Sequence, residues 1–138
     1  MSRQSELAEL SRIYDSSALS NRNLIINGAM TVAQRGTSTT GIVSSGFYSV
    51  DRVYTQTLSL GTWTESQDTN APSGFSNSFK VLCTTADASP AAGDYKFATH
   101  RIEAQNLQQL SFGTSEAKAI TLSFWVKCSE YNYQPDQG

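Results

Sequence analysis

Residues 119–128, with the sequence Ala-Ile-Thr-Leu-Ser-Phe-Trp-Val-Lys-Cys, alternate strictly along the chain. Five apolar side chains share one face of this segment: Ile120, Leu122, Phe124, Val126 and Cys128. A period of two is typical of a half-buried β-strand. Such a strand belongs in the middle of a sheet, yet only ten residues follow it. We therefore expect a β-sandwich whose core is completed by another chain.

The composition limits the classes of partner. The chain has 138 residues, a net charge of −2 and no run of one charge sign, which argues against binding nucleic acid or an anionic membrane surface. Serine and threonine make up about a quarter of the residues, as in β-rich proteins of extracellular or virion type. Residues 1–10 lack the apolar centre of a secretory signal, and no stretch is apolar enough to span a membrane. We expect synthesis in a cytoplasm and no membrane insertion.

A short helix is predicted at residues 4–15, because Leu7, Leu10 and Tyr14 recur at helical spacing and Ile13 adjoins them. A helix of this length is marginal by itself in water. We expect its apolar stripe to dock on the domain, on a second copy or on a larger assembly, with a frayed surface helix as the alternative. The predicted organisation is a helix and linker at 1–23, for docking or oligomerisation, and a β-sandwich at 24–138.

The rest of the sequence has the pattern of an all-β structure. Short apolar runs between Gly, Pro, Asn and Asp clusters predict the following strands: 24–35, 47–60, 61–66, 78–85, 95–103 and 119–128. Asn27-Gly28 signals a turn or bulge in the first run, and a hairpin is expected around 58–61. Residues 36–46 are expected to be a loop, and 104–118 to cross between sheets with a helical turn. The fold class is mainly β: an antiparallel, jelly-roll-like β-sandwich, completed by oligomerisation, with a short N-terminal helix.

The cysteines and acidic loops give no case for a metal or cofactor. Cys83 and Cys128 fall on separate predicted strands without CxxC spacing, which excludes a zinc knuckle. Two buried free thiols are favoured, with a cross-strand disulfide as the alternative. Asp68 and Asn70 have the spacing that begins a calcium loop, but Ala71-Pro72 interrupts it. We expect no metal and no cofactor.

Enzyme motifs are missing from the sequence. His100 is the sole histidine, and no nucleophile elbow, phosphate-binding glycine loop or zinc-protease motif is present. We therefore expect no catalytic residues. Asp51 adjoins Arg52, and Glu103 lies two residues from Arg101, so Asp51/Arg52 and Arg101/Glu103 are interpreted as structural cross-strand charge pairs.

Aromatic side chains are the remaining candidates for contacts. Trp125 falls opposite the apolar face of its predicted strand, and Tyr48, Tyr54 and Trp63 join it as candidates for glycan or subunit contact. An outward tryptophan can stack on a sugar, or a neighbouring copy can cover it. The third alternative is that segment 104–118 of the same chain covers the tryptophan.

Four blocks resemble jelly-roll modules in tail-fibre and related appendage proteins of tailed bacteriophages, notably marine and cyanobacterial ones. The first runs from Asn23 to Met30 and continues through Ala33–Ser38. The second is Tyr48-Ser49-Val50-Asp51-Arg52-Val53, in which Val53 replaces the usual tryptophan. The third is Arg101-Ile102-Glu103 with Asn106-Leu107, and the fourth is Ala117–Lys127. Residues 3–23 also resemble the helix and linker that precede such modules.

The resemblance implies a carbohydrate-binding-module-like jelly roll in a homotrimeric virion appendage. In such proteins the N-terminal segment attaches to the particle and the β module faces the host, and the chain continues beyond the Trp-Val-Lys strand. We expect a non-enzymatic virion structural protein that contacts other tail or capsid proteins and forms an oligomer, a trimer being favoured. The alternatives are a receptor-recognition protein that binds host surface polysaccharide and a capsid-decorating protein.

Overall fold

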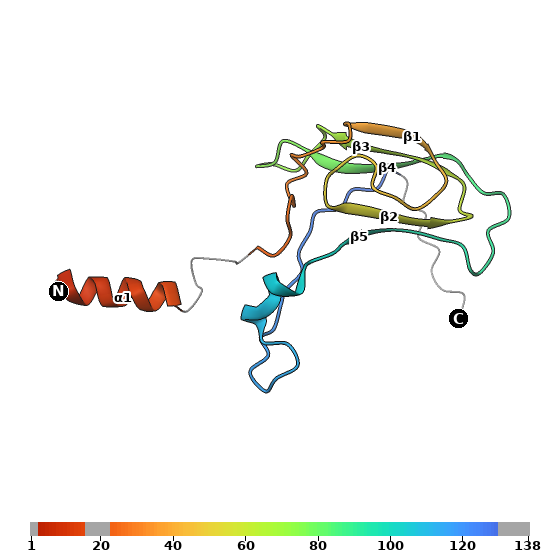
Figure 1. The fold of residues 1–138 in the computed structure, drawn as a ribbon. Helices are drawn as coiled ribbons and strands as arrows, with labels where there is room; N and C mark the ends of the chain where they lie inside the picture. The colour runs from red at the N-terminus through yellow and green to blue at the C-terminus, as the bar shows by residue number, and fades with distance from the viewer. Residues whose placement is uncertain (1–2, 16–22, 130–138) are drawn as a thin grey trace, which may run out of the picture.

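The computed structural model describes residues 3–15 and 23–129 of the chain (Figure 1). It contains one α-helix, five strands and one 3-10 helix: α1 (Arg3–Asp15), β1 (Ser38–Ile42), β2 (Val53–Leu58), β3 (Thr62–Asp68), β4 (Ser78–Thr85), β5 (Tyr95–His100) and η1 (Ala104–Leu110). The mainly β class with a short N-terminal helix is confirmed. The predicted helix, the strand after Gly61, the strand at 78–85 and the helical turn in 104–118 are also present.

Two small antiparallel sheets make up the β region. β1, β3 and β4 form one sheet with β3 in the centre, and β2 pairs with β5 in the other. Figure 1 shows the two sheets as facing layers. Neither sheet closes on itself among the described strands, so the structure shows two open layers.

The predicted hairpin around 58–61 is wrong, because β2 and β3 belong to different sheets. The chain changes layer through Ser59 and Gly61, which both have positive φ, at 50° and 70°. A Cβ on Gly61 would collide with the backbone carbonyl of Thr85. Glycine is thus required where the crossover passes the end of β4.

The predicted strand at 24–35 is also wrong. Asn27 adopts φ 60°, and its side-chain amide donates to the carbonyls of Val32 and Asp51, each at 2.9 Å. Its side-chain oxygen accepts from the Val32 amide at 3.0 Å. The Asn27 side chain thus bonds backbone groups that a neighbouring strand would otherwise bond, and the segment forms a turn. The expected loop at 36–46 contains β1, and the expected strand at 47–60 is regular only in β2.

The alternating segment 119–128 forms no strand in the structure, which contradicts the prediction. Leu122, Phe124 and Val126 are 71%, 74% and 82% exposed, and Trp125 on the other face is 78% exposed. A strand needs a neighbour that completes its hydrogen-bond ladder. None of the described strands pairs with this segment, so its alternating apolar face does not pack within a sheet of the described chain.

The interior is small and partly polar. Within the described ranges, the buried apolar residues are Ile42, Val50 and Leu110, and the buried polar residues are Ser49, Thr55, Thr57 and Glu65. The expectation of buried cysteines is wrong, because Cys83 and Cys128 are both exposed, and Cys83 is a free thiol. The contact between the sheets therefore depends strongly on polar groups.

Candidate binding surface

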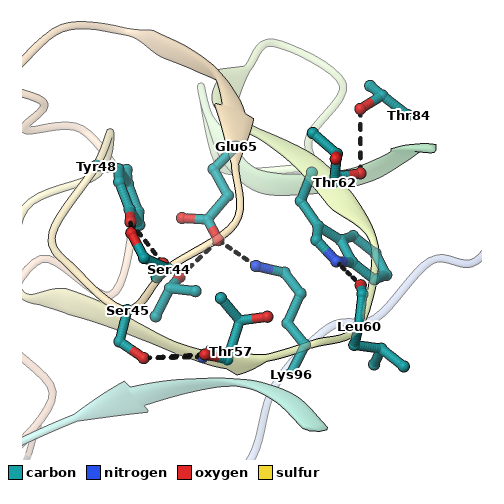
Figure 2. Close-up of polar contacts among 11 residues, drawn as sticks. Ser44, Ser45, Tyr48, Thr57, Leu60, Thr62, Glu65, Thr84 and Lys96 are labelled. Carbon is teal, nitrogen blue, oxygen red and sulfur yellow. Dashed lines mark hydrogen bonds and ion pairs between the residues drawn. The ribbon is translucent and has the colours of Figure 1, made fainter. Parts of the chain in front are cut away.

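An ion pair joins the two sheets at the centre of the molecule (Figure 2). Lys96 of β5 donates to Oε1 of Glu65 on β3 at 2.7 Å, and the Thr55 hydroxyl of β2 donates to the same oxygen at 2.5 Å. The side chains of Glu65 and Lys96 are only 2% and 8% exposed. The Lys96 ammonium also lies 5.1 Å from the centre of the Trp63 ring. This cluster is closed to solvent and acts as a structural link between the layers.

The pairing of β2 with β5 sorts their residues onto two faces. Thr55 and Thr57 are buried, Thr57 is opposite Lys96, and both Thr55 and Lys96 contact Glu65, so these residues share the inner face. The alternate residues lie on the solvent side, which we call the outer face. Within the strands it comprises Tyr54, Gln56, Leu58, Tyr95, Phe97 and Thr99. Arg52 and Arg101, just outside the strands, adjoin it at the pocket.

A pocket of about 200 Å³ opens at one end of the outer face. Its lining is Phe47, Arg52, Tyr54, Thr99, Arg101, Ile102 and Glu103. The rings of Phe47 and Tyr54 meet edge to face, with centroids 4.9 Å apart. The Arg101 guanidinium lies 5.2 Å from the centre of the Tyr54 ring, and that of Arg35 lies 5.1 Å from the centre of the Phe47 ring.

The ion pairs around the pocket differ from those inferred from sequence. Asp51 pairs with Arg35 at 3.6 Å, and its carboxylate also accepts from the Gln34 amide at 3.1 Å. Glu103 accepts from the Gln105 side chain at 2.8 Å. Neither Arg52 nor Arg101 has a carboxylate partner among the ion pairs of residues 3–15 and 23–129. Two arginines and one carboxylate residue, Glu103, therefore line the pocket without a direct ion pair between them.

His100 lies on the inner side of β5, behind the pocket. Its Nε2 accepts a hydrogen bond from the Ile26 amide at 3.3 Å, which requires that nitrogen to be unprotonated. Burial, followed by the nearby charge of Arg52, lowers the pKa of His100 below 6.5, although a hydrogen bond with the Arg52 backbone opposes the shift. In its neutral form, His100 thus holds the turn at Ile26.

The other predicted contact residues are dispersed. Tyr48 is half-buried and donates to the Ser44 carbonyl at 2.5 Å, while Trp63 is half-buried and donates to the Leu60 carbonyl at 2.5 Å. Trp125 lies in the exposed segment. Of the predicted aromatic residues, Tyr54 alone lines the pocket.

The predicted docking helix stands apart from the sheets in Figure 1. Leu7 and Leu10 are 66% and 59% exposed, and no extensive contact between α1 and a strand is found in the described part of the chain. The side chains of Ile13 and Tyr14 lie outside the described residues.

Sequence reasoning missed Phe47, Thr99 and Phe97. The signal for the last two was the alternation of Tyr95, Phe97, Thr99 and Arg101, which marks one face of a strand. Phe47 enters the pocket from outside both strands, so periodicity alone does not identify it.

The loop that resembles the start of a calcium site is occupied by protein groups. Asp68 accepts from the Asn70 amide at 2.8 Å and pairs with Lys80 at 3.0 Å. These hydrogen bonds, with that of Asn70 contributing most, lower the pKa of Asp68 below 3.8. No group of three side chains suited to hold a metal occurs in the described ranges.

Comparison of the chain with protein-family models, curated proteins and solved structures finds no match. No helix in the described parts of the chain has both the length and the apolar character needed to cross a membrane.

Proposed function

We propose that this protein is a non-enzymatic structural component of a bacteriophage tail fibre or related appendage, whose β module forms an oligomer. The observation that carries the proposal is the amount of apolar surface left outside the core. Three apolar residues are buried in the described ranges, whereas the segment 119–128 exposes Ile120, Leu122, Phe124, Trp125 and Val126 at 60–82%. Apolar surface of this extent is typical of a site of protein contact.

The strand edges add to this argument. β4 lies at one edge of its sheet, and β5 has β2 as its single strand partner among the described strands. The other side of β2 is already bonded by Gly46 and Ser45. Val81 and Leu82 of β4 are 40% and 49% exposed. An open edge presents unpaired backbone groups that pair readily with another strand. The alternating segment 119–128 has the pattern of such a strand, so a second copy is a suitable source.

We assign the protein to a phage appendage because four blocks of its sequence resemble such proteins. Asn27 and Asp51, from the first and second blocks, are joined by the hydrogen bond between the Asn27 side chain and the Asp51 carbonyl. The third block contributes Arg101 to the pocket beside Arg52 of the second. The first three blocks are thus neighbours in space, which supports the proposal that they belong to one module.

The oligomer is tested by measuring the mass of the purified protein in solution by light scattering and native mass spectrometry. We expect a trimer, and Leu122→Ser with Phe124→Ser should dissociate it. Val43→Ser is the control, because Val43 is 62% exposed but lies outside segment 119–128. A folded monomer at high concentration would contradict the oligomeric role.

The attachment role of α1 is tested separately in assembled particles. Leu7→Asp with Leu10→Asp should abolish incorporation, because it places two charges on the apolar stripe. Ser5→Asp with Ala8→Asp adds the same charge to another side of the helix and should be tolerated. Gold-labelled antibody should mark the tail; label on the shell would assign the protein to capsid decoration instead.

A further inference from the structure

We propose that the outer face of the β2–β5 sheet binds an acidic saccharide, with a sugar carboxylate held between Arg52 and Arg101. This binding site goes beyond the structural role and does not depend on it. The proposal has three supports: an excess of positive charge at the pocket, the chemistry along the face and a strained backbone at the pocket.

The charge of the pocket favours an anion, because its lining contains two arginines against one carboxylate residue, Glu103. Arg52 and Arg101 extend from neighbouring strands, next to the paired residues Val53 and His100, and both line the same pocket. Their guanidinium groups lack carboxylate partners among the described ion pairs. A guanidinium group presents a planar fork of donors that matches a carboxylate. Stacking of Arg101 on Tyr54 holds this fork in place before a ligand arrives.

The rest of the outer face favours a sugar as the carrier of the carboxylate. Gln56 donates to the Thr99 hydroxyl at 3.1 Å, which places an amide and a hydroxyl beside the pocket. Farther along β5, Phe97 and Tyr95 are 48% and 41% exposed, with ring centroids 5.3 Å apart. A saccharide offers hydroxyl groups to Gln56 and Thr99 and C–H faces to the rings of Phe97 and Tyr95.

The dimensions suit a short chain of sugars. The pocket, at about 200 Å³, is smaller than the roughly 300–1,000 Å³ of a drug-sized site. Phe97 is four residues from Arg101, which corresponds to about 13 Å along a strand. We therefore infer that one acidic ring occupies the pocket and that the next rings follow the strand toward Phe97. Glu103 at the pocket wall is an acceptor for sugar hydroxyl groups.

The backbone of Arg52 is strained in a way that fits a ligand site. Its φ is 71°, a left-handed conformation that is unfavourable for a residue with a long side chain. Residues held in such conformations concentrate at binding sites. Arg52 lines the pocket with Arg101 while it holds this strained conformation.

The test uses trigalacturonic acid as the probe, followed by amide shifts in NMR spectra of the isotope-labelled full chain. We expect saturable shifts at residues 52–56 and 97–101. The fully methyl-esterified trimer, which keeps the rings but lacks the charges, should bind at least about tenfold more weakly. Equal binding of the acid and the ester would overturn the proposal, as would an absence of shifts on the outer face.

Variants separate the site from general charge attraction. Arg101→Gln should weaken binding of the acid at least about tenfold, and exposed Phe97→Ala should weaken it with the fold intact. Arg3→Gln removes the same charge from α1 and should bind like the parent. A loss in Arg3→Gln equal to that in Arg101→Gln would overturn the proposal. A triglutamate peptide that binds as tightly as the saccharide would also overturn it, in favour of an acidic protein partner.

Discussion

Lys96 Nζ lies 2.7 Å from Glu65 Oε1 across the space between the two sheets. Each residue stands on a different sheet, and both side chains are almost removed from solvent. A buried charge without its partner is strongly unfavourable, so the pair constrains how the layers face each other. This link is unusual because few apolar residues surround it.

Removing one member of this pair should destabilise the fold severely. We expect Lys96→Met to lower the free energy of unfolding by about 3–5 kcal/mol, because Glu65 then remains buried without a counter-charge. Urea denaturation measures the change. The double variant Glu65→Leu with Lys96→Met should lose less than the sum of the single variants. Lys80→Met removes an exposed partner of Asp68 and should have a much smaller effect.

Acidification should destabilise the protein through His100. Its pKa is lowered in the folded state, so the unfolded state binds more protons as the pH falls through 6.5. The free energy of unfolding should therefore decrease between about pH 7 and pH 5. His100→Gln should flatten this part of the curve. Parallel curves for the two proteins would contradict the lowered pKa.

Gly61→Ala should destabilise the crossover between β2 and β3. The new methyl group meets the Thr85 carbonyl, and the positive φ adds strain. We expect a loss of at least about 2 kcal/mol in the free energy of unfolding. Gly93→Ala is the matched control, since a Cβ there meets nothing within 4 Å. A neutral Gly61→Ala variant would show that the crossover can shift.

Asn27→Ala should loosen the turn that precedes β1. The change removes the two hydrogen bonds that the side chain donates and the one that it accepts. We expect a loss of about 2 kcal/mol. Asn23→Ala, which removes one exposed hydrogen bond to the Ile25 amide, should cost less. Thermal unfolding followed by circular dichroism compares the two variants.

Arg52 should show a conflict between stability and binding. Arg52→Gly relieves the left-handed strain and should be about 1 kcal/mol more stable than Arg52→Ala, which retains it. Both variants lose the guanidinium group, so both should bind trigalacturonic acid more weakly than the parent protein. Equal stability of the two variants would argue against strain at this position.

The strand predicted at 78–85, most of the strand predicted at 95–103, which ends at His100, and the helix predicted at 4–15 are present because local pattern and final structure agree there. Period-two and helical spacing report which side of an element is apolar, and turn residues mark its ends. Tyr54, Arg52 and Arg101 were also singled out from sequence, and the pocket brings them together. The strand predicted at 24–35 failed because the Asn27 side chain takes the hydrogen bonds that a ladder would use.

The sequence by itself determined the β-rich character of the chain, the terminal helix and the alternation of 119–128. Only the tertiary structure decided that Glu65 meets Lys96, that β2 leaves β3 to pair with β5, and that Arg52 and Arg101 share a pocket. Those relationships join residues far apart in the chain, and a local pattern says which face is apolar but not what it packs against. The alternating segment shows the same limit, because a strand forms only where a neighbouring edge completes its hydrogen bonds.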